Sequence, residues 1–158
     1  MKKKVAVLIS GSGSNLQALI DACAKTDYPA EICVVISNKA DAYGLTRAKN
    51  AGIATRVISH KDFASREAFD AKLTEELKAN GAEIVCLAGF MRLLTPGFVE
   101  SWKDHLINIH PSLLPAFKGT HTHEAAIKAG VKFAGCTVHF VRAEMDVGPI
   151  IMQAVVPV

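Results

Sequence analysis

The sequence has no apolar run long enough to cross a membrane. A spanning helix needs ~20 consecutive apolar residues, and every apolar stretch here is interrupted well before that length. Met1-Lys2-Lys3-Lys4 followed by the apolar Val5–Ile9 resembles the start of a signal peptide, but polar residues follow too soon for a secretory core. We therefore expect a protein of the cytoplasm.

Cysteine is scarce, and its spacing matches no metal or redox motif. The chain has 4 cysteines and no Cys-x-x-Cys pair. All of them lie in apolar segments, which predicts buried, reduced thiols and argues against a disulfide framework. The cysteines are Cys23, Cys33, Cys86 and Cys136. His121 and His123 also lack a third ligand at suitable spacing, so we expect no metal site.

Neither sign of charge is in large excess. The 18 Lys and Arg residues are nearly balanced by 15 Asp and Glu, which leaves a formal net charge of +3, and no basic run follows the first residues. This balance gives no electrostatic basis for nucleic-acid binding. It suits small anionic ligands that are bound by a few local groups.

The pattern of apolar residues indicates one α/β domain over residues 1–158. Runs of strand length alternate with segments whose apolar residues recur at helical spacing. This alternation predicts a mostly parallel sheet with helices on both faces and an antiparallel C-terminal strand pair. The expected strands are Val5–Ser10, Ile32–Ser37, Ile53–Ile58, Ile84–Ala88, Leu106–His110, Cys136–Val141 and Ile150–Val156.

Several helix ends carry local signals. Thr95-Pro96 predicts an N-cap followed by proline at the first helical position. Gly81 is expected just after the end of a long helix. Thr122 is expected to cap the helix that follows it. His60 and His105 are expected at the surface.

A glycine loop, Gly11-Ser12-Gly13-Ser14-Asn15, lies between the first expected strand and the next helix. Glycines let the backbone approach a ligand closely, and free amides at a helix N-terminus attract an anion. The motif therefore favours phosphate binding by Gly13, Ser14 and Asn15. A tight turn with a Ser or Asn cap remains an alternative.

Two well-known phosphate loops do not fit this segment. The dinucleotide fingerprint requires a third glycine where this chain has Leu16, and an acidic residue where it has Ser37-Asn38-Lys39. A P-loop requires Gly-Lys-Ser/Thr, which the sequence lacks. The loop thus suits the terminal phosphate of a small ligand better than NAD or ATP.

Asn108 and His110 are two residues apart on the fifth expected strand, so both side chains project from the same face. His110 is expected at the carboxyl edge of the sheet, where ligands bind, and Asp146 can fold back toward it from the last loop. An amide, an imidazole and a carboxylate suit acyl transfer without a covalent enzyme intermediate. The alternative, equally open on residue chemistry alone, is that Asn108 and His110 only satisfy backbone groups. His139 is expected to be structural or to support the site.

At NIHPSLLP the chain strongly resembles the phosphoribosylglycinamide formyltransferases, also called glycinamide ribonucleotide transformylases, of the formyltransferase family. NxHPSLLP marks the wider family, and the longer matches point to this branch. The matching segments are ISGSGSNLQALI, ISNKADAYGLTRA, LAGFMRLLTPGFV, NIHPSLLPAFKGTHTHEAAI and GCTVHFVRAEMDVGPIIMQ.

The resemblance implies a Rossmann-like formyltransferase fold and a role in purine biosynthesis. It implies 10-formyltetrahydrofolate as formyl donor and 5-phosphoribosylglycinamide as acceptor, with no nucleic acid or membrane partner; a homodimer is left open. The acceptor phosphate is expected on Gly13, Ser14 and Asn15. The implied catalytic residues are Asn108, His110 and Asp146. The implied folate-binding residues are Arg66, Met91, Arg92, Leu93, Leu94, Asn108, Arg142, Ala143, Glu144, Met145 and Asp146.

Two features depart from the family pattern. Val147 stands where many relatives have a small residue, which predicts a stiffer loop beside Asp146. The family also normally continues beyond the position of Val158, and we expect this chain to lack that C-terminal tail. Three rivals remain open: a methionyl-tRNA formyltransferase, a formyltetrahydrofolate hydrolase (deformylase), and a non-catalytic domain that binds a phosphate ligand.

Overall fold

The computed structural model describes residues 1–158. Its strands are β1 (Lys3–Ile9), β2 (Ala30–Ser37), β3 (Thr55–Val57), β4 (Ile84–Leu87), β5 (Leu106–His110), β6 (Phe133–Phe140) and β7 (Ile150–Pro157). Its helices are α1 (Ser14–Cys23), α2 (Tyr43–Asn50), α3 (Arg66–Ala79), α4 (Pro96–Ser101) and α5 (Thr122–Ala129), with a short 3-10 helix, η1 (His60–Asp62), before α3.

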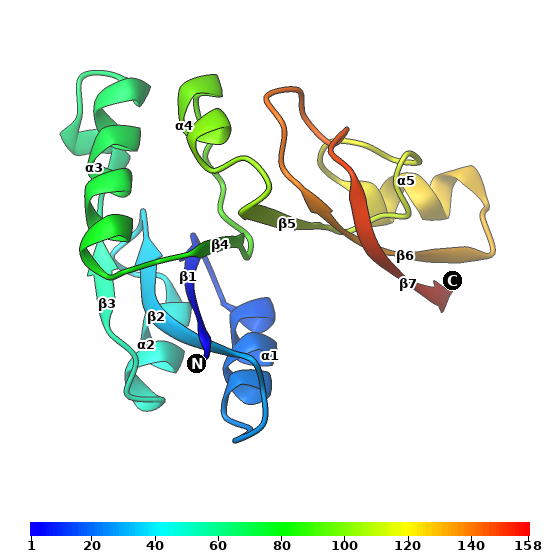
Figure 1. The fold of residues 1–158 in the computed structure, drawn as a ribbon. Helices are drawn as coiled ribbons and strands as arrows, with labels where there is room; N and C mark the ends of the chain where they lie inside the picture. The colour runs from blue at the N-terminus through cyan, green and yellow to red at the C-terminus, as the bar shows by residue number, and fades with distance from the viewer.

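All strands belong to one sheet, in the order β3-β2-β1-β4-β5-β6-β7. The pairs from β1 to β5 are parallel, whereas β6 runs antiparallel to both β5 and β7. The chain builds outward from β1 to β3 and then returns to place β4 on the other side of β1 (Figure 1). The expected fold class is therefore confirmed. The strand order reverses its direction between β1 and β4, and such a topological switch point is where open α/β sheets bind ligands.

Helices cover both faces of the parallel part of the sheet (Figure 1). On β1, Val5, Val7 and Ile9 pack with residues of α1 and α2. The alternate residues Ala6 and Leu8 pack with residues of α3 and α4. A strand buried on both faces needs apolar residues at every position, which explains the continuous apolar run after the first lysines. The buried strand gives the loop at its carboxyl end a rigid support.

The C-terminal strand β7 lies at the edge of the sheet and is exposed along its whole length. Met152, Val155 and Val156 are among its exposed large side chains. Figure 1 shows β7 far from α1 and α2, at the end of the sheet opposite β3. None of the helices has the length and apolar character needed to span a membrane.

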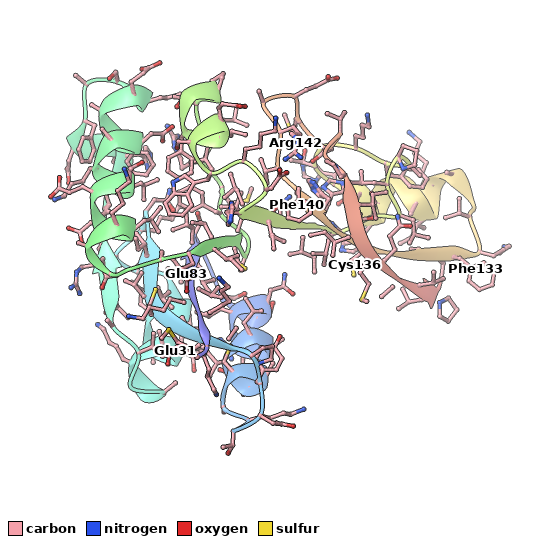
Figure 2. All side chains as sticks on the ribbon, in the orientation of Figure 1. Glu31, Glu83, Phe133, Cys136, Phe140 and Arg142 are labelled. Carbon is pink, nitrogen blue, oxygen red and sulfur yellow. The ribbon has the colours of Figure 1, made fainter.

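The cysteines differ from the expectation of full burial. All 4 are unpaired, but each is only partly buried. Cys136 lies on β6 next to the exposed β7 (Figure 2), so fewer groups cover it than a central strand would provide. Burial nevertheless raises the pKa of the Cys86 thiol to about 11. Cys86 is therefore a thiol, not a thiolate, at neutral pH.

One helix start is as expected and another is not. The Thr95 side chain accepts the N–H of Phe98, and proline follows it at the start of α4. The prediction that Thr122 caps α5 is wrong, because His121 holds the N-cap position and Thr122 is the first helical residue. The Thr122 hydroxyl instead donates to the carbonyl of Pro111 at 2.6 Å. This bond ties α5 to the segment that follows β5.

Candidate active site

The glycine loop after β1 presents unpaired backbone amides. Gly13 is the N-cap of α1 with φ 75°, a left-handed conformation, and Ser14 begins the helix. The Gln17 N–H donates to the Gly13 carbonyl at 2.8 Å, whereas the N–H groups of Ser14 and Asn15 have no partner within the protein. Amides at a helix N-terminus form a ready anion site. The structure thus has free amides where the motif requires them, and the alternative of a Ser or Asn cap is not found, because Gly13 is the N-cap and no side chain caps α1.

Helix α2 holds this loop through hydrogen bonds to the loop's carbonyl groups. The Gly44 N–H donates to the Gly11 carbonyl at 3.0 Å, and the Arg47 Nε donates to the Ser12 carbonyl at 2.8 Å. A Cβ atom on Gly13 would lie only 2.7 Å from the Cα of Gly44. The loop and α2 therefore approach this closely only because both positions are glycine.

His110 ends β5 and is 5% exposed. Its Nε2 lies 3.0 Å from the carbonyl oxygen of Phe117, and its Nδ1 lies 3.5 Å from Oδ1 of Asp146. A carbonyl oxygen only accepts, so Nε2 carries a proton. A second proton on Nδ1 gives the imidazolium, which satisfies both the carbonyl and the carboxylate.

The loop carrying Asp146 folds back onto β5, as the sequence suggested. The other carboxylate oxygen of Asp146 accepts the N–H of Gly119 at 2.9 Å. Asp146 has φ 58°, a left-handed conformation that turns the chain. A Cβ atom on Gly148 would overlap the carbonyl oxygen of Phe140, so glycine is required there. Val147 is 40% exposed, and the loop accommodates its side chain at the surface.

Asn108 is oriented by His139 on the neighbouring strand. The two residues are paired in the antiparallel register of β5 and β6. The His139 Nδ1 lies 3.0 Å from the Phe140 carbonyl and therefore donates, which leaves Nε2 as an acceptor. The Asn108 amide nitrogen lies 3.3 Å from that Nε2. One amide N–H is thus fixed, and the second N–H is available to a ligand.

A cleft of about 190 Å³ lies beside Asn108 and Asp146. One wall is the loop between β4 and α4, and the other is the loop between β6 and β7. Most of the residues expected to contact folate line this cleft. They are Arg92, Leu93, Leu94, Asn108, Arg142, Ala143, Glu144, Met145 and Asp146.

Two expected folate residues do not line the cleft, and a third is already paired. Arg66 is the exposed first residue of α3. Met91 is 68% exposed and is not among the residues that line the cleft. Arg142 lines the cleft, but its Nη2 lies 2.6 Å from Oδ1 of Asp104. Figure 2 shows Arg142 just beyond the end of β6, next to the chain reversal toward β7.

A second hollow, of about 220 Å³, lies on the α1 side of the sheet. It is lined by Asn15 and shares Leu87 and Asn108 with the first cleft. Only β4 separates β1 from β5, so their carboxyl ends lie about 10 Å apart. Asn108 therefore lies between the glycine loop and the first cleft, although His110 itself lines neither hollow.

These features define a class of protein. The molecule is an α/β domain whose switch point carries a helix terminus with free amides, together with an amide, an imidazole and a carboxylate. Such groups stabilise the oxyanion of an acyl transfer and assist its proton transfers.

Comparison with known proteins identifies the family. Residues 3–158 match the family described as formyl transferase, and the chain belongs to this family. It is 52% identical over 154 residues to the phosphoribosylglycinamide formyltransferase of Escherichia coli, covering 98% of this chain and 73% of the relative. It is 57% identical over 159 residues to the trifunctional purine biosynthetic protein adenosine-3 of Drosophila melanogaster, covering 99% of this chain but only 12% of that protein.

Solved structures agree with this membership. The crystal structure of a phosphoribosylglycinamide formyltransferase from Brucella melitensis superposes with a TM-score of 0.96 at 51% identity, covering 100% of this chain and 81% of the other. A glycinamide ribonucleotide transformylase from Symbiobacterium toebii gives a TM-score of 0.95, also at 51% identity, covering 99% and 74%. The Rossmann-like formyltransferase fold expected from the resemblance is therefore confirmed.

Proposed function

We propose that this chain transfers the formyl group of 10-formyltetrahydrofolate to the amine of 5-phosphoribosylglycinamide, a step of purine biosynthesis. The observation that carries this proposal is the arrangement of Asn108, His110 and Asp146 between a cleft and a row of unpaired amides. The names of the relatives supply the acceptor and the pathway. Four unpaired cysteines support a cytoplasmic setting.

The acceptor is held by its phosphate at the glycine loop. The amides of Gly13, Ser14 and Asn15 donate to the phosphate oxygens, and the start of α1 adds a favourable field. From there the ligand extends toward β5, past β4. The estimated separation of about 10 Å between the two strand ends suits a ribose with phosphate at one end and glycinamide at the other.

The folate occupies the cleft between the two loops. Leu93 and Leu94 provide apolar contacts for its ring system, and the backbone groups near them provide hydrogen bonds. The loop from Arg142 to Asp146 forms the opposite wall. This placement brings the formyl carbon to Asn108, where the acceptor amine arrives from the other side of the sheet.

The amine nitrogen then attacks the formyl carbon, and the formyl oxygen becomes an oxyanion. The free N–H of Asn108 donates to the oxyanion, and the positive charge of protonated His110 stabilises it through space. The Asp146 carboxylate orients the imidazole through Nδ1. A water between Asp146 and His110 carries the proton from the attacking nitrogen to the folate nitrogen that leaves. No enzyme nucleophile takes part, which agrees with the raised pKa of Cys86.

A direct assay tests the proposal. We expect the chain to release tetrahydrofolate from 10-formyltetrahydrofolate only when 5-phosphoribosylglycinamide is present, with one formylated glycinamide formed per tetrahydrofolate. Release without any acceptor would indicate a hydrolase instead, and formylation of methionyl-tRNA would indicate the tRNA enzyme. Binding of the acceptor with no turnover would indicate a non-catalytic domain.

Replacing His139 tests the orientation of Asn108. His139→Leu removes the acceptor for the Asn108 amide, so we expect kcat to fall about twentyfold while both KM values stay nearly unchanged. His139→Gln keeps an acceptor near the position of Nε2, and we expect it to recover much of the loss. Equal losses in the two variants would show that His139 acts through packing alone.

A further inference from the structure

The loop between β4 and α4 is fixed at two points by side chains from distant parts of the chain. The Ser10 hydroxyl accepts the N–H of Met91 at 2.8 Å, and the Asp70 carboxylate accepts the N–H of Thr95 at 2.7 Å. Ser10 directly follows β1 and is 5% exposed, whereas Asp70 lies on α3 and is 3% exposed. Two buried side chains thus hold the two ends of one short segment.

Between these two anchors the backbone is free. The N–H and C=O groups of Arg92, Leu93 and Leu94 make no hydrogen bond within the protein. The same three residues line the cleft beside Asn108. Backbone groups need partners when they are removed from water, so a ligand that fills the cleft must supply them. The anchors therefore present a fixed edge of donors and acceptors to that ligand.

Ser10 is itself held in one orientation. Its hydroxyl donates to the Asn38 side-chain oxygen, and the Asn38 amide nitrogen lies 3.3 Å from Nδ1 of His60. The amide can only donate, so this ring nitrogen must be unprotonated. Partial loss of hydration and the charges of Arg92, Lys61 and Lys39 lower the pKa of His60. His60 was expected at the surface but is half-buried. It is the last member of a hydrogen-bond chain that leads through Asn38 and Ser10 to Met91.

Burying the Asp70 carboxylate at this position costs free energy of folding. Its neighbours Phe69 and Leu73 on α3 belong to the apolar core. Oδ2 binds the Thr95 N–H, but Oδ1 is buried without any hydrogen-bond partner. A buried carboxylate with one partner stabilises a fold poorly compared with an apolar side chain. A role in placing the loop explains why a carboxylate stands there.

We propose that Ser10 and Asp70 are positioning residues for the folate, an inference that rests on the proposed function of the cleft. By fixing Met91 and Thr95, they hold the intervening backbone in the geometry that binds the pterin ring before the ligand arrives. Neither residue contacts the reacting atoms. Their loss weakens folate binding and leaves the acceptor site intact.

The test compares Ser10→Ala and Asp70→Ala with the original chain in two measurements. Tetrahydrofolate, the expected product, is titrated by calorimetry, and we expect its Kd to rise about tenfold in each variant. Hydrogen exchange is expected to accelerate at the Met91 amide in the first variant and at the Thr95 amide in the second. The KM for 5-phosphoribosylglycinamide and kcat at saturating folate are expected to stay within about twofold.

Two further variants separate positioning from general stability. Asp70→Asn keeps an oxygen acceptor for Thr95, and we expect it to restore most of the folate affinity. Glu75→Ala removes an exposed carboxylate from the same helix, where it pairs with Lys72, and we expect no change. An unchanged tetrahydrofolate Kd in both alanine variants, or an equal loss of folate and acceptor binding, would overturn the inference. Failure of the original chain to bind tetrahydrofolate would instead overturn the proposed function.

Discussion

Replacing His110 by alanine is expected to lower kcat for formyl transfer about a thousandfold, because the oxyanion loses a nearby positive charge and the proton relay loses its imidazole. The two KM values are expected to change little, since His110 lines neither ligand hollow. Steady-state kinetics with both substrates varied will separate kcat from the two KM values. Near-normal turnover in this variant would contradict the mechanism.

The effect of His110 is expected to depend on Asp146. In His110→Ala the Asp146 carboxylate, whose side chain is 8% exposed, stays buried without its counter-charge. The double variant His110→Ala/Asp146→Asn should therefore be at least as stable to heat as His110→Ala. Its kcat should be no lower than that of the single variant, because residues that act as a unit lose their effect together. If the loss of kcat in the double variant equalled the product of the losses in the two single variants, the two residues would act independently.

The sheet was largely predictable from the sequence because its strands are apolar runs between polar loops. The bounds of β5, Leu106–His110, are the predicted ones. Other strands begin earlier than predicted because backbone pairing continues beyond the apolar run. β1 begins at Lys3 and β6 begins at Phe133. The predicted Ile53–Ile58 strand shortens to Thr55–Val57, which pairs only with β2 at the sheet edge.

The site was predictable where side chains share a strand and less so where loops meet. Alternation alone placed Asn108 and His110 on one face. The partners of His110 and Asp146 in the segment after β5 left no such signal. Phe117 offers only its carbonyl to His110, and Gly119 offers only its N–H to Asp146. Backbone groups are common to every residue, so their use in a site depends on loop conformation and not on residue type.

The anchors of the loop after β4 were missed for a related reason. Ser10 and Met91 are 81 positions apart in the sequence, and Asp70 and Thr95 are 25 positions apart. Only the pairing of β1 with β4 and the packing of α3 beside α4 bring them together. Asp70 was the one detectable signal, since a charged residue at a buried helical position between Phe69 and Leu73 requires a partner.

Replacing Gly13 by alanine is expected to raise the KM for 5-phosphoribosylglycinamide about fiftyfold and to leave the tetrahydrofolate Kd unchanged. Gly13 has φ 75°, where a Cβ atom is strained, and that atom would also lie 2.7 Å from the Cα of Gly44. Backbone cannot move aside as a flexible side chain does, so the loop must shift away from α2. The shift misaligns the amides of Ser14 and Asn15, which are the expected phosphate donors. Inhibition by inorganic phosphate should weaken in parallel with the acceptor KM.

Gly52 provides the matched control for Gly13. It has φ 72°, but a Cβ atom there would meet nothing within 4 Å, and it lies beyond the end of α2, away from the loop after β1. Gly52→Ala therefore carries the backbone strain without the clash, and we expect a lower melting temperature with an unchanged acceptor KM. If both variants raised the acceptor KM equally, the cause would be general destabilisation. A normal acceptor KM in Gly13→Ala would show that the phosphate binds elsewhere, because a displaced α1 terminus cannot hold it in the same geometry.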